Sequence, residues 1–244
     1  MKYAVATVGA VALGTAVLLK VRVTNMATYV LVHGGNMSTD TWNRLSGTNT
    51  YPPGGHLGTH IWDGTVSYLK AHGHRVFAPT LKDEFTSSLT EHIEQVCGLI
   101  LENDLMEIIL VGHSYGGFVI TGVADRLPER IRNLVYLDSG LPDPGESLMD
   151  LLMKVYSGSH TANLPDPSPP YVEKIQFNPA TIRKLTKTYI RCTKSEFIQV
   201  TQLAKEKIDA EGGGWTYLEL PSSHVPMADM PEQFYRMMLT FANR

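Results

Sequence analysis

The chain has 244 residues, of which 43% are hydrophobic and 18% are charged, and its formal net charge is −3. This composition excludes an intrinsically disordered chain and provides enough apolar side chains for one sizeable core. The slightly acidic balance gives no basic stripe, so it argues against nucleic acid as a partner. The two cysteines, Cys97 and Cys192, match neither a disulfide framework nor a paired metal-binding spacing, which fits a reducing compartment.

An almost uncharged run, Tyr3 to Leu19, opens the chain and has basic residues on either side. At about 17 residues it is at the short limit for a membrane-spanning helix, and no small-residue cleavage site of a secretory signal follows it. Met26 directly precedes the first strong strand, so a start of translation there is the alternative. Residues 1–25 are therefore interpreted as an extension outside the fold: an anchor, a signal or a non-native start. We expect a cytoplasmic protein, or a membrane-anchored one through residues 3–19 if the extension is native.

From residue 28 onward, short β-branched runs alternate with longer amphipathic stretches, which is typical of a parallel sheet with helices on both faces. Continuous apolar runs predict six strands, at residues 29–32, 75–78, 107–111, 134–137, 188–191 and 216–220. Helical periodicity predicts helices at residues 62–71, 87–102, 118–127, 196–211 and 231–241. The sequence thus predicts one α/β domain over residues 26–244, with a mostly parallel six-stranded sheet.

Two segments interrupt this alternation. Residues 43–60 are rich in Gly, Pro, Thr and Asn, so they are predicted to form a loop inserted near the mouth of the site. Residues 141–186 combine Pro-rich turns with apolar helical stretches at 148–156 and 171–177. This second segment is predicted to be a small helical cap over the site.

Residues 107–117 combine a buried strand, the sequence Gly-His-Ser-Tyr-Gly at 112–116 and the start of a helix. A nucleophilic serine of this type sits on a strained, tight turn, and the glycines two positions before and after it let strand and helix approach closely. A chance match in an ordinary turn is the alternative, but strand and helix flank the motif as it requires. Ser114 is therefore predicted to be the catalytic nucleophile.

The residues His33, Gly34 and Gly35 follow the first predicted strand, where a backbone loop can direct an amide N–H into the site. In the usual geometry such an amide pairs with the amide of the residue after the nucleophile, and the two stabilise the oxyanion. Gly35 and Tyr115 are therefore predicted to form the oxyanion hole. His33 itself is interpreted as a structural residue of the loop.

A further histidine, His224, lies between the last predicted strand and the last predicted helix. In hydrolases built on this kind of turn the base follows the nucleophile in chain order, and no other of the nine histidines lies after a terminal strand. His224 is predicted to be the general base, with a loop histidine of purely structural role as the alternative. The histidines form no convincing metal-binding set, so no metal ion is expected.

Three segments together, residues 29–34, 112–117 and 223–227, resemble the compact α/β-hydrolases of the hydroxynitrile lyase and methyl-ketone or methyl-salicylate esterase type. The resemblance covers residues 28–243, and residues 137–142 and 189–193 point to the same branch. It implies an α/β-hydrolase fold whose eight-strand plan is trimmed to six, a helical cap and no cofactor.

The chain departs from this family at the acid of the triad. Plant members carry an aspartate after the penultimate strand, where this chain has Ser195 next to Glu196, whereas Asp138 follows the preceding strand. A carboxylate at either position can orient the imidazole. Asp138 is predicted to be the acid and Glu196 is the alternative. The non-catalytic interpretations are an aspartate bonded to loop amides and a glutamate in the first turn of a helix.

The combined pattern predicts a serine hydrolase that cleaves a carboxylic ester, or a related activated carbonyl, through an acyl-enzyme. The apolar and aromatic cap predicts a hydrophobic or aromatic small-molecule substrate. The residues expected to contact it are Gly34, His113, Leu152 and Tyr156. The sequence leaves the oligomeric state open.

Two alternatives come from other classes. The first is a hydroxynitrile-lyase-like carbon–carbon lyase, but the resemblance implies a Lys after the catalytic His and a Thr in the first oxyanion loop, where this chain has Val225 and Gly34-Gly35. The second is a ligand-binding receptor with slow turnover, which an intact Ser, His and oxyanion loop disfavours.

Overall fold

The computed structural model describes residues 26–156 and 167–243. A single six-stranded sheet forms the centre of the molecule, its neighbouring strands are parallel, and the strand order is β2-β1-β3-β4-β5-β6. The strands are β1 (Thr28–Val32), β2 (Arg75–Phe77), β3 (Ile108–His113), β4 (Ile131–Leu137), β5 (Lys187–Cys192) and β6 (Trp215–Leu220). The six-stranded α/β fold is thus confirmed, and the extension predicted for residues 1–25 lies outside the described residues.

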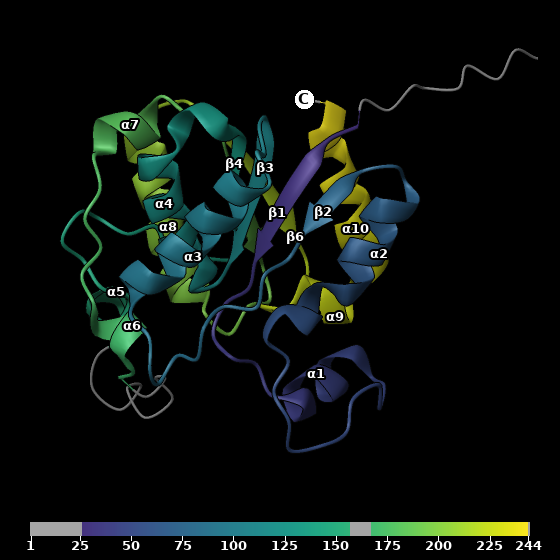
Figure 1. The fold of residues 1–244 in the computed structure, drawn as a ribbon. Coiled ribbons are helices and arrows are strands. Elements are labelled where there is room, and N and C mark those ends of the chain that lie inside the picture. Colours follow the sequence, from purple (N-terminus) through teal and green to yellow (C-terminus); the bar gives the residue numbers. More distant parts are fainter. Residues whose placement is uncertain (1–25, 157–166, 244) are drawn as a thin grey trace, which may run out of the picture.

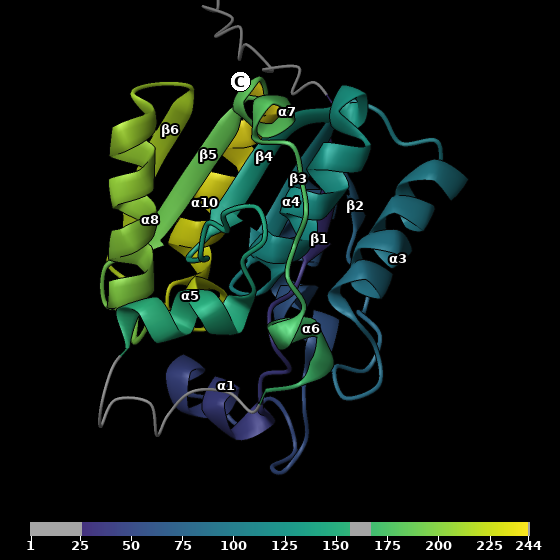
Figure 2. The ribbon, with the colours of Figure 1, turned by 90° about the vertical axis from the view of Figure 1, so that its left-hand side faces the viewer.

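Helices cover both faces of the sheet. One face carries α3 (Leu89–Glu102), α4 (Gly116–Arg126) and α8 (Ile198–Glu211), and the other carries α2 (Asp63–Ala71) and α10 (Pro231–Thr240) (Figures 1 and 2). Strand β1 shows why two cores result, because successive side chains point to opposite faces. Val30 and Val32 join the core under α3 and α4, whereas Tyr29 and Leu31 join the core under α2 and α10. All four are fully buried.

The predicted helices are present, with ends that differ from the predicted ones by at most two residues. Residues 87–102 are predicted to be helical, but α3 begins at Leu89 because Ser88 is its N-cap. The Ser88 hydroxyl accepts from the Glu91 amide at 3.1 Å, and the Glu91 carboxylate accepts from the Ser88 amide at 2.9 Å. This capping box satisfies amides that the first helical turn leaves without partners.

The prediction of a loop over residues 43–60 is wrong at both ends. Helix α1 (Thr39–Ser46) occupies the start, and a 3-10 helix (Gly58–Trp62) occupies the end. Ser38 caps α1 through its hydroxyl, and Gly47 ends it with a φ of 67°, a backbone conformation that glycine adopts readily. Because α1 is short and mostly polar, with Trp42 and Leu45 as its only large apolar residues, the flanking caps are its main signal.

The cap segment, residues 141–186, contributes α5 (Leu148–Val155), α6 (Pro169–Val172) and α7 (Pro179–Arg183), and residues 157–166 lie outside the described residues. The helix predicted at 171–177 is wrong beyond Val172. There the backbone pairs across the base of the cap instead: Gly145 N–H donates to the Ile175 carbonyl at 2.7 Å, and Ile175 N–H donates to the Glu146 carbonyl at 3.0 Å. These two hydrogen bonds join residues 145–146 to Ile175, and we call this base of the cap its neck.

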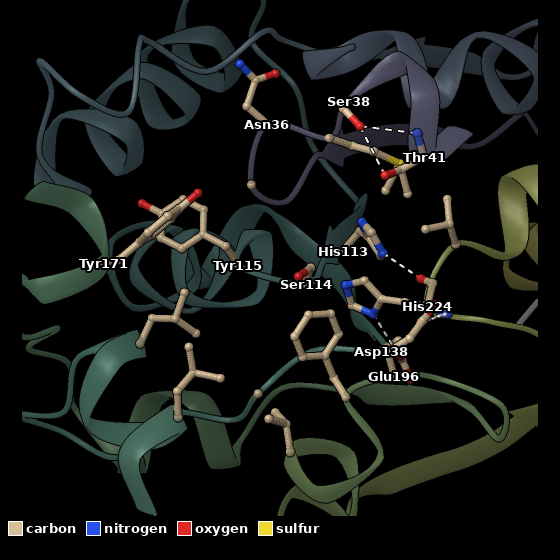
Figure 3. Close-up of a pocket in the computed structure, with 18 of the residues that line it drawn as sticks. Asn36, Ser38, Thr41, His113, Ser114, Tyr115, Asp138, Tyr171, Glu196 and His224 are labelled. Carbon is tan, nitrogen blue, oxygen red and sulfur yellow. Dashed lines mark hydrogen bonds and ion pairs between the residues drawn. The ribbon is translucent and has the colours of Figure 1, made fainter. Parts of the chain in front are cut away.

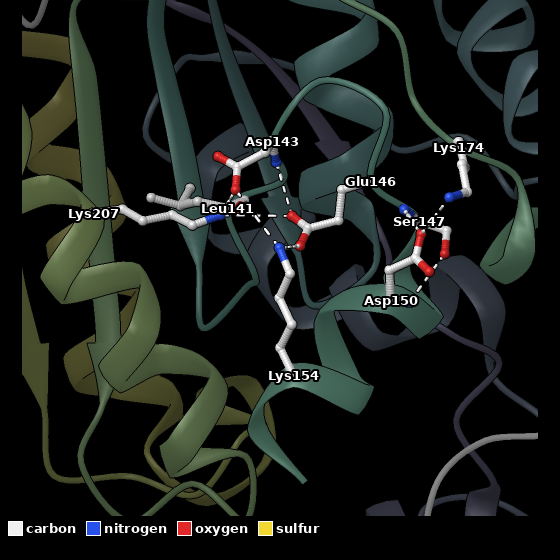
Figure 4. A network of polar contacts seen from close by, with 8 residues as sticks. All are labelled: Leu141, Asp143, Glu146, Ser147, Asp150, Lys154, Lys174 and Lys207. Atoms are coloured by element: carbon white, nitrogen blue, oxygen red, sulfur yellow. Dashed lines mark hydrogen bonds and ion pairs between the residues drawn. The ribbon is translucent and has the colours of Figure 1, made fainter.

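A network of charged side chains anchors this neck (Figure 4). The Glu146 side chain is 4% exposed, accepts from the Asp143 amide at 2.9 Å and pairs with Lys154. Lys207 of α8 donates to the Asp143 carboxylate at 3.0 Å and to the Leu141 carbonyl at 2.7 Å, and it lies 3.6 Å from Glu146. The neck is therefore bound to α8, on the main body of the fold, by ionic as well as backbone contacts.

Within the two described ranges, no helix has the length and apolar character needed to cross a membrane. The predicted anchor at residues 3–19 falls outside those ranges. In the same part of the chain no group of three or more His, Cys, Asp or Glu side chains could hold a metal ion. Cys97 and Cys192 are both free and buried.

Candidate active site

The turn between β3 and α4 places Ser114 at the carboxyl edge of the sheet. Its φ is 55°, in the left-handed region that non-glycine residues rarely adopt. A Cβ at Gly112 would lie 2.5 Å from the Gly116 carbonyl oxygen, and a Cβ at Gly116 would lie 2.7 Å from the Val32 carbonyl oxygen. Strand, turn and helix therefore meet so closely that only glycine fits on either side of the serine.

The loop after β1 lies directly against this serine. A Cβ at Gly34 would lie 2.7 Å from the Cβ of Ser114. The next residue, Gly35, lines the same pocket as Ser114 and Tyr115. Both backbone segments predicted to supply the oxyanion hole are thus brought together at the serine.

The histidine after β6 meets the carboxylate after β4. His224 Nδ1 lies 2.7 Å from Asp138 Oδ2, and the Asp138 side chain is buried. Because a carboxylate only accepts hydrogen bonds, Nδ1 carries the proton and Nε2 is left as an acceptor. The second oxygen of Asp138 accepts from the Cys192 amide at 2.8 Å, which fixes the orientation of the carboxylate.

The second candidate acid, Glu196, contacts the backbone of the histidine and not its ring. Glu196 Oε2 lies 3.4 Å from the His224 amide nitrogen. The interpretation of Glu196 as a residue of a first helical turn is wrong, because α8 begins two residues later, at Ile198. Glu196 instead lies in a turn at the pocket wall (Figure 3).

The histidine beside the nucleophile supports the loop that carries His224. His113 Nε2 donates to the His224 carbonyl at 2.8 Å, and the two ring centroids are 4.6 Å apart (Figure 3). Burial, the largest influence on the pKa of His113, holds it well below the usual histidine value, so the ring is neutral. Although His113 lines the pocket, its hydrogen bond gives it a supporting role that the sequence pattern did not indicate.

The interpretation of His33 as a structural residue is confirmed by its contacts. Its Nδ1 donates to the Gly34 carbonyl at 2.7 Å, and its Nε2 accepts from the Leu81 amide at 3.0 Å. Both ring nitrogens are therefore occupied by backbone groups. Burial lowers the pKa of His33 to about 4, so the ring is neutral at physiological pH.

A cavity of about 420 Å³ opens over Ser114 and is mostly apolar. Of the residues predicted to contact substrate, His113 and Leu152 line it, whereas Gly34 and Tyr156 do not. Gly34 lies beneath the serine side chain, and Tyr156 packs against the hydrophobic core instead. The sequence did not single out several lining residues, which come from the loop after β1, α1, α5 and α8: Met37, Leu45, Leu148 and Val200.

Comparison with known proteins agrees with the fold. A model of the alpha/beta hydrolase family matches residues 29–237. The chain is 42% identical over 138 residues to the carbendazim hydrolyzing esterase of Nocardioides sp. (strain SG-4G), with 53% of this chain and 48% of that protein covered. It is 35% identical over 101 residues to the alpha-hydroxynitrile lyase of Arabidopsis thaliana, with 35% of this chain and 37% of that protein covered.

Solved structures show the same fold. An extracellular alpha/beta-hydrolase from a Paenibacillus species has a TM-score of 0.65 to this chain at 20% identity, over 88% of this chain and 98% of that one. The chain spans less than half the length of the first curated relatives it matches.

Proposed function

Because this chain belongs to the alpha/beta hydrolase family, we propose that it is a serine hydrolase that cleaves carboxylic esters through an acyl-enzyme. The observation that carries the proposal is the 2.7 Å contact between His224 Nδ1 and Asp138 Oδ2. This contact leaves His224 Nε2 free to accept a proton, and His224 lines the same pocket as Ser114. The contact also favours Asp138 over Glu196 as the acid.

The chemistry proceeds in two halves. Ser114 Oγ attacks the ester carbonyl while His224 Nε2 takes its proton, and the carbonyl oxygen becomes an oxyanion that the Gly35 and Tyr115 amides stabilise. Collapse of this intermediate expels the alcohol, which receives the proton from His224. Water, activated by the same imidazole, then attacks the acyl-enzyme and releases the acid and the free serine. Asp138 stays ionised and stabilises the imidazolium in both halves.

The pocket favours an uncharged, largely apolar ester. Its charged lining residues are Asp138, which is paired with His224, and Glu196, so no described cation in the wall could pair with a carboxylate on the substrate. The same acidic wall repels the carboxylate product and assists its release. Since one relative is named for the hydrolysis of carbendazim, we include this compound among the test substrates.

The test is hydrolysis of a nitrophenyl ester series and of carbendazim by the full chain and by Ser114→Ala. We expect turnover by wild type, with longer acyl chains preferred over acetate, and none by Ser114→Ala. A fluorophosphonate probe is expected to add one covalent label to wild type and none to the variant. Ser139→Ala is the matched control, because this buried serine bonds the Gly140 carbonyl and does not line the pocket.

Wild type that neither turns over esters nor accepts the probe would contradict the proposal. Release of hydrogen cyanide from mandelonitrile by a protein inactive on esters would favour the lyase class instead. Tight ligand binding without turnover would favour a receptor. Each outcome is read from the same purified protein, so the three classes are separated directly.

A further inference from the structure

A tyrosine of the cap reaches the loop that carries the proposed oxyanion donor. Tyr171, in α6, is 4% exposed, and its hydroxyl donates to Glu84 Oε2 at 2.5 Å. A Cβ at Gly35 would lie 2.7 Å from this hydroxyl oxygen. The tyrosine hydroxyl is therefore packed against the backbone of Gly35, and this contact explains why position 35 needs a residue without a side chain.

The carboxylate that accepts from the tyrosine also contacts this loop. Glu84 Oε2 lies 3.4 Å from the Asn36 amide nitrogen, within hydrogen-bonding range although long. The Asn36 side chain in turn accepts from the Gly58 amide at 3.3 Å. One oxygen of Glu84 thus connects the cap to the residue that follows Gly35.

The same tyrosine packs against the second proposed oxyanion donor. The rings of Tyr171 and Tyr115 meet edge to face, with centroids 5.0 Å apart (Figure 3). The Tyr115 hydroxyl is held from the other side by His92 Nδ1 at 2.9 Å. A single side chain of the cap therefore touches both residues whose amides are proposed to stabilise the oxyanion.

We propose that Tyr171 and Glu84 are a positioning pair, through which the cap holds the Gly35 and Tyr115 amides in the geometry of the oxyanion hole; this inference rests on the proposed function. Oxyanion stabilisation depends on donors that are fixed before charge develops, and a displacement of about 1 Å can lower the rate by about 100-fold. The pair acts on the transition state and leaves substrate binding largely unchanged. Its removal lowers kcat more than it raises KM.

The experiment compares Tyr171→Phe, Glu84→Ala, the double variant and Glu84→Gln in the full chain. Each is measured for kcat and KM on a nitrophenyl ester and for inhibition by an aryl trifluoromethyl ketone, which adds to the serine and places an oxyanion in the hole. We expect Tyr171→Phe and Glu84→Ala each to lower kcat about 10-fold with KM changed less than about 2-fold. The inhibition constant is expected to rise by the same factor as kcat falls.

Two further results distinguish positioning from general stabilisation. The double variant is expected to be no worse than the worse single variant, because both changes break one contact. Glu84→Gln is expected to restore activity, since an amide oxygen can still accept from both donors. Tyr29→Phe is the matched control: it removes a buried hydroxyl that donates to the Met238 carbonyl at 2.8 Å, so it lowers stability and leaves the inhibition constant unchanged.

A second contact between the cap and the body tests whether any loosening of the cap has the same effect. Glu173 accepts from the Thr90 hydroxyl at 2.5 Å and from the Thr90 amide at 3.2 Å. An equal loss of kcat in Glu173→Ala and Glu84→Ala would overturn the inference, as would an unchanged inhibition constant in Tyr171→Phe. Absence of Ser114-dependent turnover in wild type refutes the proposed function itself and the inference with it.

Discussion

Replacement of Asp138 by asparagine tests the proposed acid with the least change in shape. Asparagine tolerates the left-handed region well, so the φ of 43° at this position adds little strain to the variant. The carboxylate accepts two hydrogen bonds, from the His224 ring at 2.7 Å and from the Cys192 amide at 2.8 Å. An asparagine has one acceptor oxygen, so it can serve only one of these donors in the native arrangement.

If the oxygen stays with Cys192, the NH₂ group faces the ring and His224 Nδ1 must become an acceptor. The imidazole proton then sits on Nε2, where the ring cannot take a proton from Ser114. A tautomer change of this kind lowers kcat by about four orders of magnitude in serine hydrolases, which corresponds to about 5.5 kcal/mol of transition-state stabilisation. The assay is kcat and kcat/KM on a nitrophenyl ester, with thermal unfolding to show that the variant is folded.

The matched control is Glu196→Gln. It weakens only a 3.4 Å contact to the His224 backbone amide, so a loss of less than about 10-fold is expected. The reasoning fails if Glu196→Gln loses several orders of magnitude while Asp138→Asn stays within about 10-fold of wild type. In that case the acid would be Glu196, and the observed ring contact would be structural.

Three further predictions concern stability. Gly116→Ala places a Cβ against backbone carbonyls, so we expect the midpoint of thermal unfolding to fall by about 10 °C. The control is Gly73→Ala, at an open position with a φ of 84°, where we expect the midpoint to fall by only a few degrees. Because the folded pKa of His33 is about 4, below the unfolded value of about 6.5, its contribution to stability is full above pH 6.5, and the free energy of unfolding decreases by about 3 kcal/mol as the pH falls to 4. Urea unfolding across this range should show a shallower decrease in the free energy of unfolding for His33→Asn. An equally steep decrease would contradict a neutral, buried His33. Glu146→Gln is expected to cost about 1–2 kcal/mol and to expose the cap to limited proteolysis. Lys174→Gln, at an exposed position in the same segment, should leave cleavage of the cap almost unchanged, and equal cleavage in both variants would argue against a neck held by Glu146.

The parts of the fold that were predicted correctly are those with strong local signals. The continuous apolar runs predicted the strands, and the glycines at 112 and 116 marked the tight turn at Ser114 because close backbone approach leaves no alternative residue there. Asp138 was predicted from the departure from the plant family's pattern, and its place in the fold supports this prediction: strand ends in a parallel sheet meet at one edge, so a carboxylate after β4 lies near a serine after β3.

The features that were missed depend on contacts distant in sequence. Helix α1 is short and has only two large apolar residues, Trp42 and Leu45, and the place of Leu45 in the pocket wall follows only from how α1 packs over the site. The extended backbone after Val172 is fixed by pairing between Ile175 and the segment at 145–146. The role of His113 depends on its hydrogen bond to a carbonyl 111 positions away in the chain, and a local sequence pattern does not indicate such a contact.

Two of the four described non-glycine residues with positive φ, Ser114 and Asp138, belong to the proposed site. Such conformations cost on the order of 1 kcal/mol or more each, and glycine relieves most of that cost. A lineage that no longer needed turnover would therefore gain stability by drifting to glycine at these two positions. Natural selection for catalysis would keep a serine and an aspartate at these positions although glycine would be more stable there.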